Sequence, residues 1–313
     1  MTNPDQGSLW IIGAGGFLGS NLASLSVEAG FTNFPASAIS WNDPAQRQKG
    51  LEKNASAFAA FARGTQATII WAAGKGGVAT QQREVMSEWS AFSDLVEVLE
   101  KTSELFGTQI VICSSAGGVY SGSLSPPFTV DTPPVAINQY GQEKIDIEKI
   151  AVARLATKYR ILIARLTNLY GPWPGNRQGL VNRLCTAAVT REPIQIYVTL
   201  DTSRDYIDVK DAAQILFGEI EFSARQSVSH GVHMCLVGSG RTTSVGEVIA
   251  TVTNVGRRKI PMSLADLSYK DLQPKDLRVV PTWIERSLLY SPVELPVGTK
   301  RLFDVLATSP RWS

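Results

Sequence analysis

Short apolar runs alternate with helix-like segments through the first two-thirds of this chain, and this alternation limits its possible folds most strongly. Runs with few polar residues are typical of strands in a parallel sheet that helices cover on both faces. The expected strands are SLWII (8–12), ASAIS (36–40), ATIIWAA (67–73), QIVICSS (109–115) and RILIARL (160–166). The expected helices span 17–28, 55–62, 85–105 and 140–158. The pattern predicts an α/β fold with a doubly wound parallel sheet.

Three glycines in the stretch IIGAGGFLGS, Gly13, Gly16 and Gly19, lie between the first expected strand and the first expected helix. Glycines placed there let a tight turn bring backbone N–H groups and the helix N-terminus close to a pyrophosphate. A Cβ atom in this turn would collide with the backbone or the phosphate. In this context the motif predicts a Rossmann-type sheet that binds a dinucleotide.

The regular alternation ends after Asn168, where the segment LYGPWPGNRQG is rich in glycine and proline. Short strands and helices follow without regular order. We therefore expect a dinucleotide-binding unit over residues 1–168, with later segments at about 203–240 interleaved into it. Residues 169–313 are expected to form mainly a smaller C-terminal α/β portion that binds the substrate.

Composition argues against several classes of protein. The chain has 30 basic and 28 acidic residues, so it lacks the positive charge typical of nucleic-acid-binding proteins. The polar start MTNPDQGS does not resemble a signal peptide, and no apolar run approaches the roughly 20 residues of a membrane span. We expect a cytoplasmic protein with no membrane attachment. Its three cysteines, Cys113, Cys185 and Cys235, are expected to be reduced core thiols.

The segment QYGQEK places Tyr140 and Lys144 four residues apart, so both side chains lie on one face of an expected helix. A tyrosine that transfers protons near neutral pH needs its phenolate stabilised, because the ordinary pKa of this side chain is about 10. A nearby ammonium group provides that stabilisation. Upstream, CSSAGGVY places Ser114 and Ser115 at the carboxyl end of an expected strand, which is the sheet edge where ligands bind. A hydroxyl there can hydrogen-bond a substrate oxygen while Tyr140 moves its proton.

With these motifs the sequence resembles the extended short-chain dehydrogenase/reductase family, specifically its nucleotide-sugar epimerases, dehydratases and ketoreductases. The resemblance covers most of the chain and implies hydride transfer between a nicotinamide cofactor and a sugar carbon. The matching blocks, in the family's order, are Gly13-x-x-Gly16-x-x-Gly19, Tyr140-x-x-x-Lys144, RLTNLYGP (165–172), SRDYIDVKDAA (203–213) and LVGSGRTTSVGEVI (236–249).

The resemblance implies a catalytic role for four residues. Tyr140 would be the proton-transferring acid or base, and Lys144 would hold the cofactor ribose and stabilise the phenolate. Ser114 or Ser115 would orient the reacting oxygen. In many relatives the catalytic Ser or Thr lies four positions before a second motif tyrosine, which in this chain is Tyr120 of CSSAGGVY. The residue at that position here is Ala116. We therefore favour Ser115, one residue earlier, over Ser114.

The resemblance also implies binding residues. Ser115, Asn168 and Arg204 correspond to positions that contact the substrate, and the arginine fork suits the oxygens of a nucleoside diphosphate. Asp205 and Asp211 are expected to be structural. The expected cofactor-binding residues are Gly13, Gly16, Phe17, Leu18, Gly19, Asp43, Ala72, Ala73, Gly74, Tyr140 and Lys144.

The choice between NAD and NADP stays open, with NAD favoured. An acidic residue at the end of the second strand would select NAD, and an arginine would accommodate the 2′-phosphate of NADP. After the expected strand 36–40, Asp43 comes slightly late and Arg47 later still. The connection 41–66 is shorter than in typical 4-epimerases and closer to that of the related sugar reductases, which favours a reductase.

Two enzymatic functions follow from the resemblance. Sugar 4,6-dehydratases carry an Asp-Glu pair where this chain has Ala-Gly-Gly (116–118), so that reaction is disfavoured. The missing cysteine at this turn argues against an epimerase-reductase of the GDP-fucose synthase type. The leading hypothesis is NAD(P)-dependent 4-epimerisation of a nucleoside-diphosphate sugar through a transient keto sugar. The alternative is an NAD(P)H-dependent 4-ketoreductase, and no residue of the sequence decides between them.

A hypothesis of another class is a non-catalytic dinucleotide-binding or redox-sensing module. The intact Tyr140 and Lys144 argue against it, because the fold alone does not need that pair. No metal site is expected, since a zinc site needs three or four converging ligands and the two histidines do not supply them. The family resemblance also implies a homodimer formed through the helices at 85–105 and 140–158.

Overall fold

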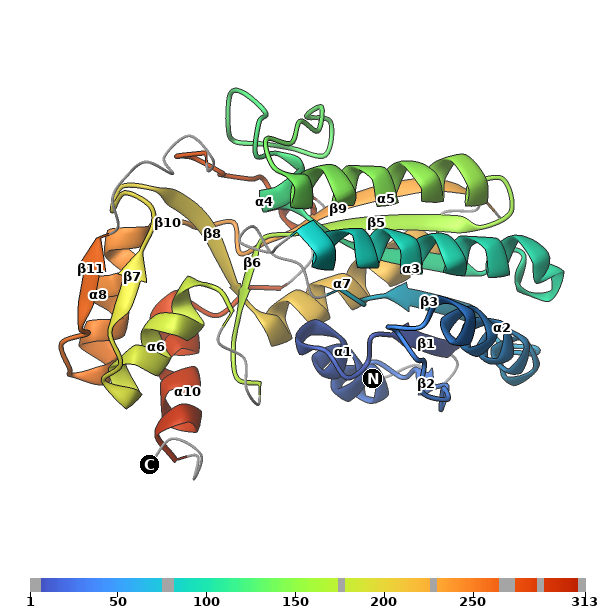
Figure 1. Cartoon of the computed structure of the whole chain (residues 1–313), viewed down its shortest axis with the longest axis horizontal. Coiled ribbons are helices and arrows are strands. Elements are labelled where there is room, and N and C mark those ends of the chain that lie inside the picture. Colours follow the sequence, from blue (N-terminus) through green and yellow to red (C-terminus); the bar gives the residue numbers. More distant parts are fainter. Residues whose placement is uncertain are drawn as a thin grey trace.

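The computed structural model describes residues 7–74, 82–173, 178–225, 230–264, 274–285 and 290–308. Its main feature is a six-stranded, fully parallel sheet with the strand order β2-β1-β3-β4-β5-β9 (Figure 1). This confirms the doubly wound parallel sheet expected from the sequence. The strands are β1 (Ser8–Ile12), β2 (Thr32–Asn33), β3 (Ala67–Trp71), β4 (Gln109–Ser115), β5 (Arg160–Leu166) and β9 (Gly231–Val237).

Helices cover both faces of this sheet, and a buried apolar cluster lies under each layer. One layer is formed by α2 (Pro44–Phe61), α3 (Gln82–Lys101) and α5 (Gln139–Leu155), and the other by α1 (Phe17–Glu28) and α7 (Val209–Arg225). Strand side chains alternate between the faces, so Trp10 and Ile12 of β1 join the first cluster whereas Leu9 and Ile11 join the second. A strand that is apolar on both faces is therefore the one that this architecture requires.

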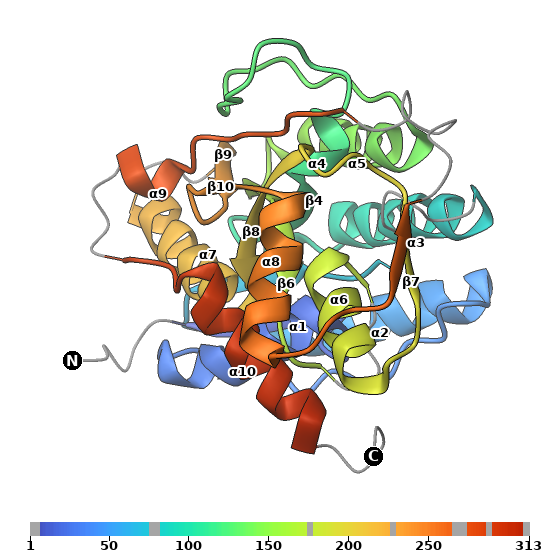
Figure 2. The same ribbon diagram turned by 90° about the vertical axis from the view of Figure 1, so that its left-hand side faces the viewer.

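A smaller portion, seen toward the viewer in Figure 2, packs beside the sheet around its own apolar cluster. It has a three-stranded sheet of order β10-β8-β6 and a two-stranded sheet of β11 and β7. Its strands are β6 (Asn168–Tyr170), β7 (Ile194–Ile196), β8 (Ser203–Asp208), β10 (Thr242–Ser244) and β11 (Met262–Leu264). Its helices are α6 (Leu180–Thr190), α8 (Val245–Gly256) and α10 (Leu295–Thr308). Three short helices lie elsewhere: η1 (Ser103–Leu105), α4 (Ala116–Val119) and α9 (Thr282–Glu285).

The chain leaves the main sheet after β5 and later returns to it. β6 and β8 belong to the small three-stranded sheet, but α7 packs on the main sheet and β9 forms its edge beside β5. Within the segment 203–240, α7 and β9 thus pack with the main sheet and β8 with the smaller portion. Within the described ranges, no helix has the length and apolar character needed to cross a membrane.

The strand expected at 36–40 is wrong. The second strand is β2, two residues long, which pairs with Ser8 and Leu9 and ends before Pro35. Proline has no N–H to donate to a ladder. Beyond it, the backbone N–H and C=O of Ser37 bond instead to the side chain of Asn54 on α2, at 2.8 and 3.0 Å. The backbone groups of this segment are thus satisfied by a helix side chain and not by a neighbouring strand.

This correction changes one argument drawn from the sequence. Because β2 ends at Asn33, the connection to β3 covers residues 34–66 and is longer than the expected 41–66, so the spacing no longer favours a reductase. Most of this connection is α2, which begins at Pro44 and not near residue 55. Asp43 caps it, and proline is well suited to a first helical position.

Candidate active site

The glycine turn has the close packing that its sequence predicted. Gly13 has a φ of 95°, and a Cβ there would lie 2.6 Å from the backbone nitrogen of Ala73 at the end of β3. A Cβ at Gly19 would overlap the carbonyl oxygen of Gly13, so any side chain would push α1 away from the turn. Gly16 is the N-cap residue of α1 and offers no side-chain acceptor to the first helical N–H groups.

These residues fit the pyrophosphate of a dinucleotide. No acidic residue lies in the first turn of α1, and no side chain caps its N–H groups, so the positive end of the helix is available to an anion. Phe17 and Leu18 form this first turn, and the ring of Phe17 lies 6.4 Å from that of Trp173. Ala72, whose N–H bonds to Ile12 at 2.9 Å, continues from β3 beside the turn.

Asp43 lies in a different setting from the one expected. Its carboxylate accepts a hydrogen bond from the Gln46 N–H at 3.1 Å and caps the exposed start of α2. The nearby Arg47 is buried and bonds to Asp94 at 2.6 Å and to Ser90 at 2.8 Å, both on α3. Both candidate residues for cofactor selection thus also serve the packing or capping of α2.

Ser115 and Tyr140 meet at Gly118. The Ser115 hydroxyl oxygen accepts a hydrogen bond of 3.2 Å from the Gly118 N–H and so caps α4. The ring of Tyr140 lies so close that a Cβ at Gly118 would be 3.0 Å from its Cε1. Gly141 packs on Gly118 as well, because its own Cβ would overlap the Gly118 carbonyl. The turn after β4 therefore has to be free of side chains to seat the start of α5.

Lys144 lies one helical turn after Tyr140, with its ammonium nitrogen 5.6 Å from the centre of the Tyr140 ring. It is buried and forms an ion pair with the buried carboxylate of Glu88 on α3. Burial acts to lower the pKa of Lys144, but the neighbouring acidic groups, Glu88 first among them, outweigh it and raise the pKa above its usual value. Lys144 therefore remains a cation inside the protein.

A second buried acid lies beside this pair. Glu143 accepts a hydrogen bond of 2.9 Å from the Trp89 N–H, one residue after Glu88. Burial, reinforced by the charge of Glu88, raises the pKa of Glu143 to about 7 against the opposing effects of this hydrogen bond and of Lys144. The region around Lys144 thus holds more carboxyl groups than the sequence motifs alone indicate.

Ser114 belongs to a separate buried network. Its hydroxyl donates to Glu148 at 2.5 Å, and Glu148 forms an ion pair with Arg165 at 2.7 Å. Arg165 also donates to the hydroxyl of Tyr120 at 2.6 Å, and Tyr120 in turn donates to the Thr129 carbonyl at 2.8 Å. This network ties β4, α5 and β5 to the loop at 122–134. The structure therefore places the two serines in different surroundings, and Ser115 is the one bonded to Gly118, against which the Tyr140 ring packs.

The two expected substrate contacts in the smaller portion also have intramolecular partners. Asn168 is exposed and donates from Nδ2 to the Asp205 carbonyl at 2.8 Å. Arg204 is buried, and its guanidinium donates to the carbonyl oxygens of Ser203 and Pro274 at 2.8 and 2.6 Å. Burial lowers the pKa of Arg204. In this structure Arg204 fastens the segment at 274–275 to β8.

Asp205 and Asp211 have the structural roles expected of them. Asp205 accepts hydrogen bonds from the N–H groups of Ser239 and Gly240, at 2.8 and 2.7 Å. Asp211 accepts from Tyr290 at 2.6 Å and from the Val293 N–H at 2.7 Å. The three cysteines are free. Within the described ranges, no group of three or more His, Cys, Asp or Glu side chains could hold a metal ion.

Glu88 is the residue near Lys144 that the motifs did not reveal. A signal for it exists, because it lies on the buried stripe of α3 with Ala91, Phe92 and Leu95, three, four and seven residues later. An acidic side chain on an apolar helical stripe needs a buried partner. The sequence did not predict that this partner would be Lys144.

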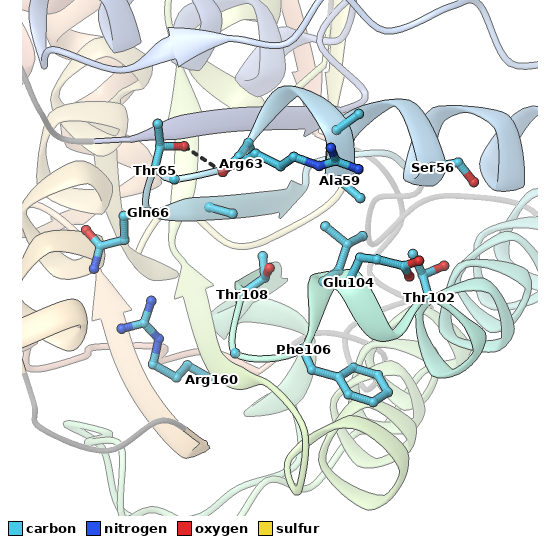
Figure 3. A pocket seen from close by; sticks show the side chains of 16 residues that line it. Ser56, Ala59, Arg63, Thr65, Gln66, Thr102, Glu104, Phe106, Thr108 and Arg160 are labelled. Atoms are coloured by element: carbon cyan, nitrogen blue, oxygen red, sulfur yellow. Dashed lines mark hydrogen bonds between the residues drawn. The ribbon is translucent and has the colours of Figure 1, made fainter.

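One cavity lies away from these residues. Its volume is about 540 Å³, and it opens at the amino ends of β3, β4 and β5, where Gln66, Thr108 and Arg160 line it (Figure 3). Ala72 and Ser115, by contrast, lie at the carboxyl ends of β3 and β4. None of the expected site residues lines this cavity.

Comparison with known proteins gives results at three levels. Residues 9–226 match the model of the NAD dependent epimerase/dehydratase family. A UDP-glucose 4-epimerase from Azospirillum brasilense is 33% identical over 178 residues, which are 51% of this chain and 50% of that protein. The chain thus spans about half the length of the curated relatives it matches.

Solved structures resemble nearly the whole chain. A UDP-glucose 4-epimerase from Thermotoga maritima, solved with UDP-glucose, has a TM-score of 0.74 at 18% identity and covers 95% of this chain and 97% of its own. RMD from Pseudomonas aeruginosa, complexed with NADPH, has a TM-score of 0.76 at 16% identity and covers 95% of this chain and 98% of its own. At these identities the likeness shows the fold alone.

Proposed function

The chain belongs to the NAD-dependent epimerase/dehydratase family, and from that premise we propose that it is an NAD(P)-dependent enzyme acting on a nucleoside-diphosphate sugar. The leading reaction is 4-epimerisation. The observation that carries the proposal is the grouping of Ser115, Tyr140 and Lys144 around the turn after β4, at the same sheet edge as the glycine turn before α1. The UDP-glucose 4-epimerases among the relatives support the substrate class.

The first residue of the mechanism is Ser115. Because its oxygen accepts the Gly118 N–H, its own O–H proton is free to donate to the oxygen on the reacting sugar carbon. That hydrogen bond holds the sugar oxygen near Tyr140, whose ring lies against the same glycine. The backbone of Gly118 thus sets the geometry between the two side chains.

Tyr140 transfers the proton. As the sugar alcohol is oxidised, its hydroxyl proton passes to the tyrosine oxygen, and the same proton returns when the ketone is reduced. The Lys144 ammonium stabilises the phenolate form that alternates with the phenol. The nicotinamide cofactor, when bound, supplies the acceptor and donor of the hydride.

Cofactor binding is assigned to the edge formed by β1, β3 and α1. Gly13, Gly16 and Gly19 let the backbone approach the pyrophosphate, and the N–H groups of Phe17 and Leu18 face its charge. Ala72, Ala73 and Gly74 at the end of β3 line the adjoining part of the site, and Lys144 holds the ribose. NAD is favoured, because several of the similar solved structures contain it.

The second candidate function is a 4-ketoreductase that exchanges its cofactor. The similarity in fold to RMD, whose structure was solved with NADPH, supports this candidate. It would use the same three residues, since reduction of a keto sugar also needs an oriented oxygen and a proton donor. The two candidate reactions differ in the source of the keto sugar. In the epimerase it forms in the site, rotates and is reduced on its other face, whereas in the reductase it binds from solution.

We also propose a homodimer formed through α3 and α5. The two helices pack side by side on one face of the sheet (Figure 1). Trp89 and Val152 on these helices are 43% and 38% exposed, so each offers apolar surface that a partner could cover. Light scattering at micromolar concentration should give twice the chain mass, and a monomeric mass would contradict the proposal.

One experiment separates the candidate functions. The freshly purified protein is denatured, the released nucleotide is identified by chromatography, and the native protein is incubated with a panel of nucleoside-diphosphate sugars that starts with UDP-glucose. Near-stoichiometric NAD together with interconversion of 4-epimers would support the epimerase. An empty site that takes up NADPH and reduces a 4-keto sugar would support the reductase. A protein that neither carries nor binds either cofactor would overturn the enzymatic proposal.

A further inference from the structure

The ion pair between Glu88 and Lys144 is a deeply buried charge pair that includes a residue of the proposed site. Their side chains are 3% and 8% exposed, and they come from α3 and α5, which lie next to each other. A buried ammonium without a partner is costly, so the carboxylate both fixes the position of Lys144 and cancels its charge. The proposed mechanism needs Lys144 but gives no reason for Glu88.

The surroundings of Glu88 point toward the cofactor edge. Its second carboxylate oxygen, Oε2, is buried and has no hydrogen-bond partner among the described residues. That oxygen lies against Gly74, three residues after the end of β3, where a Cβ would overlap it. The carboxylate is therefore packed between the lysine assigned to the ribose and the strand end assigned to the cofactor.

The other titratable groups around Lys144 do not replace Glu88. One carboxylate oxygen of Glu143 accepts a hydrogen bond from the Trp89 N–H. The other oxygen is buried and has no hydrogen-bond partner among the described residues. Cys113 on β4 is partly buried, and desolvation raises the pKa of its thiol to about 12, so it remains neutral. Tyr140 contacts the Lys144 ammonium through its ring. Glu88 is thus the acid that directly contacts the lysine.

Resting on the proposed function, we propose that Glu88 is a positioning residue that sets which redox form of the cofactor the site prefers. An oxidised nicotinamide ring carries a positive charge and the reduced ring carries none. An uncompensated Lys144 ammonium near the ribose would repel the oxidised ring, whereas the neutral Glu88–Lys144 pair does not. The ion pair therefore shifts binding toward the oxidised cofactor, the form that begins oxidation of a sugar alcohol.

The test is the ratio of the dissociation constants of NADH and NAD⁺, measured by calorimetry at pH 8. If the wild-type protein binds only the 2′-phosphorylated cofactors, NADPH and NADP⁺ replace them. Glu88→Gln leaves Lys144 uncompensated and should weaken the binding of NAD⁺ relative to NADH. The dissociation constant of NADH divided by that of NAD⁺ should therefore fall by about threefold or more. Lys144→Gln leaves Glu88 uncompensated and should move the ratio the opposite way. The double variant restores a neutral pair and should return the ratio to within about twofold of wild type.

Glu100→Gln is the matched control. Glu100 also lies on α3 and forms an ion pair with α5, through Arg154, but both side chains are partly exposed. The substitution removes the same charge with the same change of shape, away from Lys144. Its ratio should equal that of wild type, and a shift as large as that of Glu88→Gln would overturn the inference, since it would trace the effect to α3–α5 packing.

The remaining outcomes are equally decisive. If Glu88→Gln weakens both redox forms equally, Glu88 only supports the structure and the inference is wrong. If Glu88→Gln does not fold, Lys144→Gln and the double variant still differ only in the Glu88 charge, and equal ratios for those two would overturn the inference. A wild-type protein that binds neither cofactor pair would overturn the proposed function as well, which separates that failure from a failure of Glu88 alone.

Discussion

The Ser114 hydroxyl donates a 2.5 Å hydrogen bond to the buried carboxylate of Glu148, although Ser115, the next residue, is bonded to the Gly118 N–H beside Tyr140. Successive residues of a strand point to opposite faces, so β4 assigns one serine to the network with Arg165 and the other to the sheet edge. The two neighbouring hydroxyls should therefore have separable functions.

Ser115→Ala should lower turnover about 100-fold, because it removes the hydroxyl that orients the sugar oxygen. Ser114→Ala should keep the turnover of the folded protein and lower the free energy of unfolding by about 1 kcal/mol, since Glu148 retains Arg165 as a partner. Steady-state kinetics and urea unfolding of both variants measure these effects. A large loss of turnover in Ser114→Ala, with turnover retained in Ser115→Ala, would contradict the choice of Ser115.

Tyr140→Phe should lower turnover by about 100-fold to 10,000-fold, because phenylalanine cannot carry the proton. The ring that packs on Gly118 is retained, so the unfolding free energy and the cofactor affinity should change little. Full turnover in this variant would disprove the proton-transfer role and leave the fold unaffected.

Gly118→Ala should reduce turnover about tenfold or more, because the added Cβ would lie 3.0 Å from Cε1 of Tyr140 and displace its ring. Gly117→Ala is the matched control in the same short helix. Its Cβ would meet nothing closer than a Leu277 methyl at 3.9 Å, so its turnover should stay near that of wild type. Equal effects of the two substitutions would show that the spacing between Gly118 and Tyr140 does not matter for the reaction.

Glu143 should make the protein less stable as the pH rises from about 4.5 through about 7. A carboxyl group whose folded-state pKa exceeds its unfolded value stabilises the fold below the unfolded pKa and loses that contribution as the pH passes the folded one. Between pH 6 and pH 8, Glu143→Gln should therefore remove roughly 1 kcal/mol of the pH-dependent loss seen in wild type. Urea unfolding at the two pH values measures the difference.

Glu100→Gln provides the control for this pH effect. A hydrogen bond from Arg154 lowers the pKa of Glu100, so its titration lies below this window. It should leave the difference between pH 6 and pH 8 unchanged. A wild-type protein with equal stability at both pH values would contradict the assignment to Glu143.

Much of the fold could be predicted from the sequence because the strands of the parallel sheet are apolar on both faces. β1, β4 and β5 have the expected bounds, as does α1. The strand at 36–40 was wrong because its apolar residues resemble a strand locally, whereas Asn54, 17 residues away from Ser37, takes its backbone hydrogen bonds. A single side chain on a distant helix is not visible in a local pattern.

The candidate site was predictable only as far as its motifs reach. The spacing of Tyr140 and Lys144 follows from helical geometry, and Ser115 is bonded to Gly118, against which the Tyr140 ring packs. Glu88 could not be assigned, because its contact with Lys144 depends on how α3 and α5 pack across 56 residues of chain. The bonds of Arg204 to the backbone carbonyls of Pro274 and Lys275, 70 and 71 residues downstream, were likewise not visible in the sequence, and its contact with the substrate stays a prediction.

The late return of β9 has a consequence for how the protein forms during synthesis. The edge of the main sheet beside β5 is completed by Gly231–Val237, after the chain has built β6, α6, β7 and β8 of the smaller portion. A nascent chain that has emerged only as far as residue 168 exposes the backbone groups along one side of β5. We expect such a truncated chain to associate with itself at this open edge, which β9 covers once residues 231–237 have been added.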